Sequence, residues 1–131
     1  MKNIESDIYQ YLAERGWDKL RPSDLAKSIC IEAAELFEIF QWTNVSLEEI
    51  KQDLKKMEEI KKELADVFIY AFDMAVLLDI DVEKIIKEKL EQVKKKYPAE
   101  LMRKNAKEGS GSGADPKYWK IKNHHRQSKK S

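Results

Sequence analysis

The six residues from Val67 to Phe72 are apolar on every side of the helix that they are expected to form. A helix without a polar face is stable only where other helices cover it, so this segment predicts a buried helix in a helical assembly. Asp66 and Asp73 flank the segment and interrupt its apolar surface. A single four-helix bundle rarely covers every side of one helix, which favours assembly of several copies of the chain.

The rest of the chain predicts further helices. Its 131 residues include only four glycines and three prolines, while 42% are hydrophobic and 37% charged, a balance that favours long amphipathic helices over sheets. Apolar spacing and helix start and stop signals predict helices at residues 3–15, 22–42, 46–78 and 82–97. The pattern leaves open whether the third helix is continuous or divides between residues 53 and 58. The expected fold class is an all-α four-helix bundle.

Charge separates an acidic body from a basic tail. Residues 102–131 hold nine Lys or Arg and two Asp or Glu, whereas the preceding 101 residues have a net charge of −6. We expect a helical domain at residues 1–105 and a flexible basic tail at residues 106–131, with the Gly-Ser stretch 109–113 as a linker. The alternative is a tail that folds over a site and offers basic groups to phosphate. An acidic body argues against a nucleic-acid-binding domain.

The expected compartment is the cytoplasm. One cysteine, Cys30, excludes an internal disulfide and suits a reducing environment. No stretch approaches the roughly 20 apolar residues of a membrane span, and no signal-peptide pattern opens the chain. Cys30 lies between two isoleucines, which favours a packed thiol over a reactive one.

Two pairs of carboxylates have the spacing that places side chains on one face of a helix. Glu32 pairs with Glu35, and Glu63 pairs with Asp66. If the two faces pack together, the cluster needs cations, because an unpaired buried carboxylate is costly. Oxygen ligands select hard ions such as Mg²⁺ or Mn²⁺. No histidine precedes His124 and the cysteine is single, which argues against di-iron and zinc sites.

A solvated charged face is the alternative explanation for these carboxylates. Glu-x-x-Glu is common on exposed helices, and the spacing leaves a metal site and a solvated face both open. The apolar neighbours of Glu32 and Asp66 favour the metal site. Trp17, Trp42 and Tyr70 are candidates for stacking on a planar base, at about 1–3 kcal/mol per base; core or interface packing is their alternative role.

The carboxylates belong to motifs that resemble the MazG-like nucleotide pyrophosphohydrolases, within the all-α NTP pyrophosphohydrolase superfamily. The matching stretches run from Glu32 to Trp42, from Lys62 to Tyr70 and from Lys94 to Pro98. In this order they give Glu-x-x-Glu, a variable gap, Glu-x-x-Asp and a Lys-Tyr-Pro segment. The ordered set is far more specific than any one of its motifs, and it is most similar to the branch of the dCTP pyrophosphatases.

The resemblance implies an active site. In it, a metal-activated water attacks the α-phosphate of a nucleoside triphosphate, and Glu35 is the general base. The implied ligands of Mg²⁺, or of Mn²⁺, are Glu32, Glu35, Glu63 and Asp66. The aromatic residues implied to enclose the base are Trp17, Trp42 and Tyr70. Lys89 and Lys96 are candidates for phosphate contacts, with a solvated helix face as their alternative role.

The resemblance also implies an activity and an assembly. We expect a (d)NTP to be converted to (d)NMP and pyrophosphate, with dCTP or a non-canonical nucleotide as substrate, by a homodimer or homotetramer whose sites lie between subunits. Val93 stands where the branch has Asn, and Leu20-Arg21-Pro22 stands where it often has His, so base and sugar preference stay open. The alternatives are hydrolysis of dUTP or phosphoribosyl-ATP at the same site, or a non-catalytic helical oligomerisation or regulatory module.

Overall fold

The computed structural model describes residues 2–105 and 116–130. Within these ranges the chain forms seven helices and no strand, which confirms the all-α class. The helices fall into two compact units that meet between Val82 and Glu83. Each unit is described by itself.

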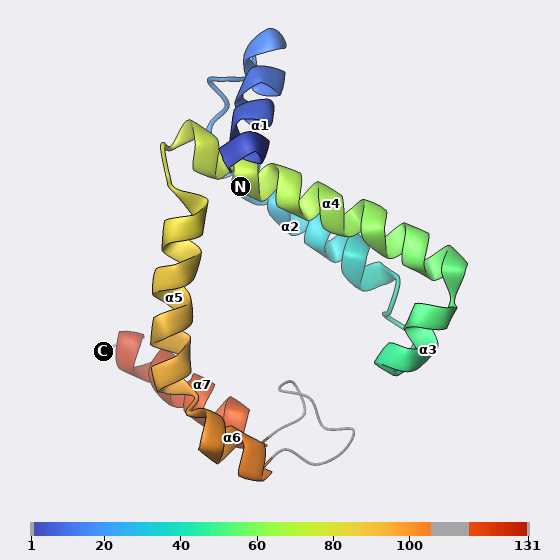
Figure 1. The fold of residues 1–131 in the computed structure, drawn as a ribbon, viewed down its shortest axis with the longest axis vertical. Coiled ribbons are helices and arrows are strands. Elements are labelled where there is room, and N and C mark those ends of the chain that lie inside the picture. Colours follow the sequence, from blue (N-terminus) through green and yellow to red (C-terminus); the bar gives the residue numbers. More distant parts are fainter. Residues whose placement is uncertain (1, 106–115, 131) are drawn as a thin grey trace. The chain divides into compact units, whose positions relative to one another are not determined.

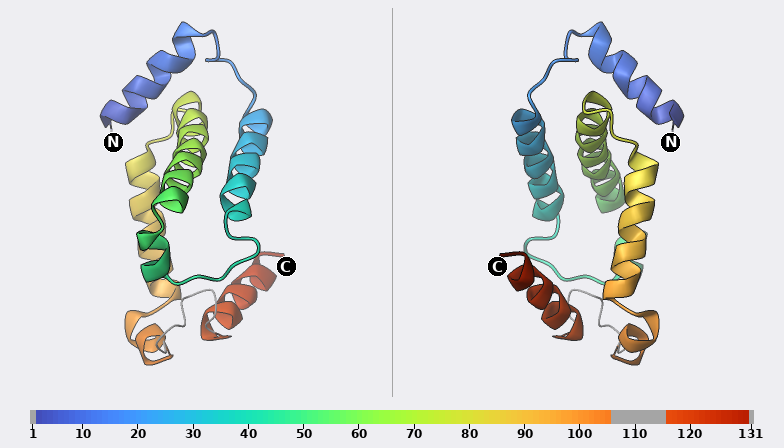
Figure 2. Two further views of the ribbon diagram at one scale, coloured as in Figure 1. Left: turned by 90° about the vertical axis from the view of Figure 1, so that its right-hand side faces the viewer. Right: turned by 90° about the vertical axis from the view of Figure 1, so that its left-hand side faces the viewer.

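The first unit is built on a helical hairpin. Helices α2 (Pro22–Glu38) and α4 (Leu54–Leu77) run antiparallel, side by side, along much of their length (Figures 1 and 2). Helix α1 (Lys2–Glu14) packs against α4, and the short α3 (Leu47–Gln52) packs where α4 begins. The hairpin therefore brings the two carboxylate-bearing helices into contact.

Local signals explain the helix boundaries. Gly16 has a φ of 70°, a left-handed conformation that suits glycine and ends α1 as the sequence predicts. Pro22 occupies the first turn of α2. At the start of α3, Ser46 accepts a hydrogen bond of 3.2 Å from the backbone N–H of Glu49, and this cap starts the helix.

The predicted third helix divides at Asp53. This residue is extended (φ −87°, ψ 91°), and its side chain accepts a hydrogen bond of 3.1 Å from the backbone N–H of Lys56. An aspartate that caps a helix in this way starts a new helix, so α3 and α4 are separate. The predicted second helix is also shorter than expected, because α2 ends at Glu38 and the next residues form turns.

The core of the first unit is small. Leu12 (1% exposed), Leu25 and Ala75 are buried, and Asp73 is buried with them. The apolar segment of α4 is less buried in the single chain than its composition predicts, since Phe68 is 53% exposed. Helices α1 and α2 pack against α4 but cover only part of its surface. The prediction for Cys30 was wrong, because its side chain is exposed on α2.

The second unit begins at the second residue of α5 (Val82–Lys96) and continues through α6 (Ala99–Asn105) and α7 (Pro116–Lys130). Helix α6 packs against α7, and the rings of Tyr97 and Tyr118 stack with centroids 5.0 Å apart. The part of the expected flexible tail that the structure describes is thus helical, while the Gly-Ser stretch lies outside the described residues. Among the described helices, none has the length and apolar character needed to cross a bilayer.

Candidate metal centre and adjoining cavity

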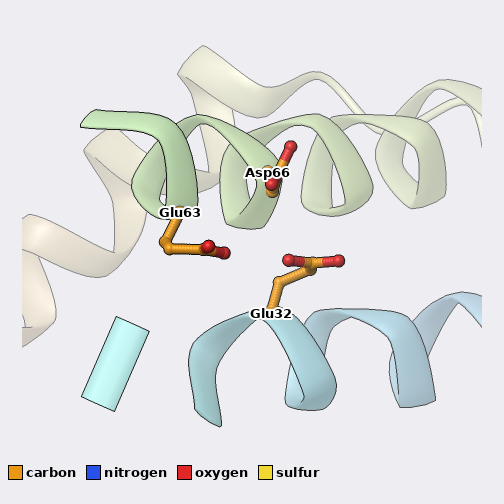
Figure 3. A group of neighbouring side chains, drawn as sticks. All are labelled: Glu32, Glu63 and Asp66. Atoms are coloured by element: carbon orange, nitrogen blue, oxygen red, sulfur yellow. The ribbon is translucent and has the colours of Figure 1, made fainter. Parts of the chain in front are cut away.

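Three carboxylates meet between the two long helices of the first unit. Glu32 projects from α2, while Glu63 and Asp66 project from α4 toward it (Figure 3). One oxygen from each residue lies within 4.8 Å of the others. Two oxygens on opposite sides of a bound Mg²⁺ are about 4 Å apart, so small side-chain movements would bring these oxygens into ligand positions.

Helix periodicity places these side chains. Glu63 and Asp66 are three residues apart, so they share the face of α4 that packs against α2. Glu32 lies on the matching face of α2, and all three side chains are half-buried. The sequence needs only two regular helices in antiparallel contact to assemble the cluster.

Glu35 lies at the rim of the cluster. Its exposed side chain lies near enough to those of Glu32 and Glu63 to contribute to their raised pKa values. It also lines an open depression together with Glu38, Glu59 and Glu63. The structure thus brings the fourth predicted ligand next to the other three, on their solvent side.

The cluster is electrostatically unsatisfied. Burial, the hydrogen bond to Glu35 and the neighbouring carboxylates raise the pKa of Glu32 to about 7. Burial, with Glu35 again contributing, raises the pKa of Glu63. One buried oxygen of each residue, Oε2, has no hydrogen-bond partner among the described residues. A hard cation would supply the missing partner, and the all-oxygen set suits Mg²⁺ or Mn²⁺.

A cavity of about 370 Å³ adjoins the cluster. Its size falls within the range of small-molecule sites. Asp66 belongs to both the cluster and the cavity wall. The wall is formed by residues of α1, α2, α4 and the α1–α2 connection, namely Tyr11, Leu12, Trp17, Leu20, Asp24, Leu25, Ser28, Asp66, Ile69, Tyr70 and Asp73.

Two of the predicted aromatic residues line this cavity. The backbone N–H of Trp17 donates a hydrogen bond of 2.8 Å to Leu12, which fixes the chain just after α1, and the Trp17 ring lies edge-on to Tyr11 with centroids 5.8 Å apart. Burial, followed by Glu32 and Asp73, raises the pKa of Tyr70 above its usual range. The Tyr70 hydroxyl therefore stays protonated and can donate a hydrogen bond.

Comparison with known proteins gives the family. The model of the MazG-like family matches residues 27–111, which include all four predicted metal ligands. The chain belongs to the MazG-like family.

Individual relatives of this MazG-like chain agree with the match. Rat dCTP pyrophosphatase 1 is 30% identical over 100 residues, which cover 74% of this chain and 58% of the relative. Human dCTP pyrophosphatase 1 is 30% identical over 101 residues, covering 75% and 59%. The chain thus spans less than two thirds of these relatives. A pyrophosphatase from Archaeoglobus fulgidus has a crystal structure that superposes with a TM-score of 0.66 at 38% identity, over 75% of this chain and 92% of that one.

The remaining predicted site residues lie elsewhere in the MazG-like chain. Trp42 follows α2, is 87% exposed and does not line the cavity. Lys89 and Lys96 are on α5 in the second unit, where the Lys96 ammonium lies 5.3 Å from the ring centroid of Tyr97. The roles of these three residues stay predictions.

Sequence reasoning missed several residues of the cavity. Asp73 is the most unusual of them, because it is a buried carboxylate whose Oδ1 has no hydrogen-bond partner among the described residues. The signal was present in the sequence: Asp73 lies three residues after Tyr70 and seven after Asp66, on the same face of α4. Tyr11 and Ser28 carried no comparable signal.

The raised pKa values predict how the metal-free MazG-like chain responds to pH. Folded Glu32 holds a proton up to a pH of about 7, whereas the unfolded chain releases it near 4.5. The free energy of unfolding should therefore fall as pH rises through this interval, with Asp73, raised by burial to a pKa of about 6, acting in the same direction. The melting temperature, followed by circular dichroism in EDTA, measures the effect.

Mg²⁺ and a variant provide the controls for this pH response. Mg²⁺ binds the ionised carboxylates, so it should reduce the fall in melting temperature, and Glu32→Gln should flatten the metal-free profile. A metal-free melting temperature that does not fall across this interval in the wild type, or that falls equally in Glu32→Gln, would contradict the assignment.

Proposed function

We propose that this chain is a metal-dependent nucleotide pyrophosphohydrolase that converts a (d)NTP to (d)NMP and pyrophosphate. The observation that carries the proposal is the position of Asp66, which joins a cluster of unsatisfied carboxylates to a cavity lined by aromatic rings. A nucleotide has the same two parts, a polyanion that needs a cation and a planar base that stacks on aromatic rings. The names of the relatives, dCTP pyrophosphatase and pyrophosphatase, support the proposal.

The metal site in this proposal consists of Glu32, Glu63 and Asp66, with Glu35 as the fourth ligand. Mg²⁺ is the proposed ion and Mn²⁺ the alternative, because both prefer oxygen ligands. When bound, the cation would neutralise phosphate charge and make water a better nucleophile. The partnerless oxygens of Glu32 and Glu63 support this assignment.

Substrate binding in this proposal divides between the cavity and the cluster. Trp17 and Tyr70 enclose the base, with Trp42 as a third aromatic contact, while Lys89 and Lys96 contact phosphates. Within the described part of the chain, the residues that line the cavity include no Lys, Arg or His, so the cavity suits the base rather than the phosphates. The triphosphate would accordingly lie at the carboxylate cluster, where a bound cation would offset the repulsion between phosphates and carboxylates.

The proposed reaction is hydrolysis at the α-phosphorus. A water oxygen forms a bond to this phosphorus, the α–β anhydride bond breaks, and pyrophosphate leaves. Glu35 accepts the proton of the attacking water, since it is the most exposed of the four carboxylates and lies near enough to Glu32 and Glu63 to affect their pKa values. We propose dCTP or a non-canonical nucleotide as substrate, which would give the protein a house-cleaning role.

Assembly, domain limits and compartment complete the proposal. We propose a homodimer or homotetramer, supported by large exposed apolar side chains on both hairpin helices, among them Ile31, Phe37 and Phe68. Residues 1–105 are the proposed catalytic domain, and residues 106–131 the proposed basic extension. The cytoplasm is the proposed compartment because the chain has a single cysteine.

A panel of nucleoside triphosphates tests the function. The purified chain is incubated with ribo- and deoxyribonucleotides, dUTP and phosphoribosyl-ATP included, in heavy-oxygen water with either Mg²⁺ or EDTA. We expect monophosphate and pyrophosphate only with Mg²⁺, and heavy oxygen in the monophosphate, because water attacks the α-phosphorus. Release of orthophosphate, or label in pyrophosphate, would contradict the mechanism. Absence of any turnover would favour a non-catalytic helical module.

A further inference from the structure

Asp73 is a buried acceptor in a cavity that the proposed reaction leaves without a polar contact to the base. The side chain is 3% exposed and lines the cavity from α4, next to Tyr70 in the helical register. Its Oδ1 is buried and has no hydrogen-bond partner among the described residues. Leaving such an atom unpaired costs free energy, so a ligand that brings a hydrogen-bond donor to it gains affinity.

The other polar groups of the cavity limit what that ligand can be. Asp24, Asp66 and Asp73 give the wall three carboxylates, and among the described residues that line it none is cationic. An anionic group in the cavity would be repelled by these carboxylates, of which, in the described part of the chain, only Asp24 forms an ion pair, 3.9 Å from Lys27. An N–H group can donate a hydrogen bond to a carboxylate, and aromatic walls favour a planar group. A nucleobase that carries an N–H donor meets both conditions.

We propose that Asp73 determines base specificity by accepting a hydrogen bond from the exocyclic amino group of the base. This inference rests on the proposed function. It assigns as substrates the nucleoside triphosphates whose base has an amino group at position 4 of a pyrimidine or position 6 of a purine. Uracil and thymine carry a carbonyl there, which would place two acceptors against each other.

The ionisation of Asp73 agrees with this role. Burial raises the pKa of its carboxyl to about 6, so the ionised form, which only accepts hydrogen bonds, predominates at neutral pH. Carboxylates make this kind of contact with the amino group of cytosine in other recognition sites. The carbonyl oxygen of uracil at the same position is also an acceptor, so it cannot form a hydrogen bond with the ionised carboxylate.

The pair dCTP and dUTP tests Asp73 directly, because the two nucleotides differ only at position 4 and the adjoining ring nitrogen. We expect the wild type with Mg²⁺ to have a higher kcat/KM for dCTP. Asp73→Asn keeps the shape of the side chain and adds an amide donor that can face the uracil carbonyl. The ratio of the two kcat/KM values should therefore fall about tenfold or more in this variant.

A binding measurement and a matched variant separate specificity from folding. The dissociation constants of dCMP and dUMP, measured by calorimetry, should show the same change in ratio in Asp73→Asn without any turnover. Asp7→Asn removes an exposed carboxylate of the same unit and should leave both ratios as in the wild type.

The outcomes distinguish the two proposals. A wild type that hydrolyses triphosphates but whose ratios are unchanged in Asp73→Asn, or that prefers dUTP, overturns the role of Asp73 alone. A wild type that hydrolyses neither nucleotide with Mg²⁺ overturns the proposed function and this inference with it.

Discussion

Glu32→Gln is expected to lower the Mg²⁺-dependent hydrolysis of nucleoside triphosphates by about 100-fold or more. The substitution keeps the shape of the side chain but removes the only charge that α2 contributes to the three-carboxylate cluster. A weaker cation site leaves the phosphates less well neutralised. Steady-state rates over a series of Mg²⁺ concentrations measure the loss, and the Mg²⁺ concentration for half-maximal rate should rise.

The same substitution is expected to stabilise the metal-free protein. Glu32 Oε2 is buried and has no hydrogen-bond partner in the described part of the chain. Burial and then the neighbouring carboxylates raise the pKa of Glu32, so a neutral amide removes unfavourable interactions. The melting temperature in EDTA should therefore be higher in Glu32→Gln than in the wild type. Opposite changes in activity and stability identify a group kept for function rather than folding.

Glu58→Gln is the matched control on the other hairpin helix. Glu58 is exposed and forms an ion pair of 3.0 Å with Lys61. Exposed pairs of this kind contribute little, so neither the rate nor the melting temperature should change appreciably. Equal rates in Glu32→Gln and Glu58→Gln would be incompatible with Glu32 as a metal ligand.

Leu12→Ala is expected to lower the free energy of unfolding by about 2–5 kcal/mol. Leu12 is the largest fully buried side chain of the described residues, in a unit with few buried apolar residues. Its removal leaves a void that the short α1 cannot close. Urea denaturation followed by circular dichroism measures the change, and loss of the cooperative transition would be the extreme form of the same result.

Ile4→Ala is the control on the same helix. Ile4 is 50% exposed, although the spacing of Ile4, Ile8 and Leu12 predicts a common buried face. Ile4→Ala should lower the free energy of unfolding clearly less than Leu12→Ala, because less apolar surface is lost from the interior. Equal costs for the two variants would mean that Leu12 does not hold α1 in place.

Helix type and the main boundaries could be predicted because local signals determine them. Gly16 ends α1 through its backbone conformation, and Ser46 starts α3 through a side-chain hydrogen bond. The division at Asp53 was left open, because an aspartate inside a helical pattern either caps a new helix or faces solvent. Burial was predicted less well: the composition around Phe68 indicates an apolar helix but not which of its sides the chain itself covers.

The carboxylate cluster could be predicted because it depends on helix periodicity alone. Glu63 and Asp66 share a face wherever α4 is regular, and contact with α2 then adds Glu32. The cavity depends on how α1 crosses α4, which no local pattern specifies. Tyr11 was therefore missed as a cavity residue, and Trp42 was grouped with Trp17 although only Trp17 lines the cavity.

Helix α4 carries both halves of the proposed site on one face, with Glu63 and Asp66 at the cation and Tyr70 and Asp73 at the base. Asp66 and Asp73 are seven residues apart, about 10 Å along the helix axis. Under the proposed function, one rigid element would therefore set the span between the bond to be cut and the base to be recognised. Substitutions at the base end can exchange one nucleotide for another while the hydrolytic end stays intact, so substrate choice and chemistry can evolve separately.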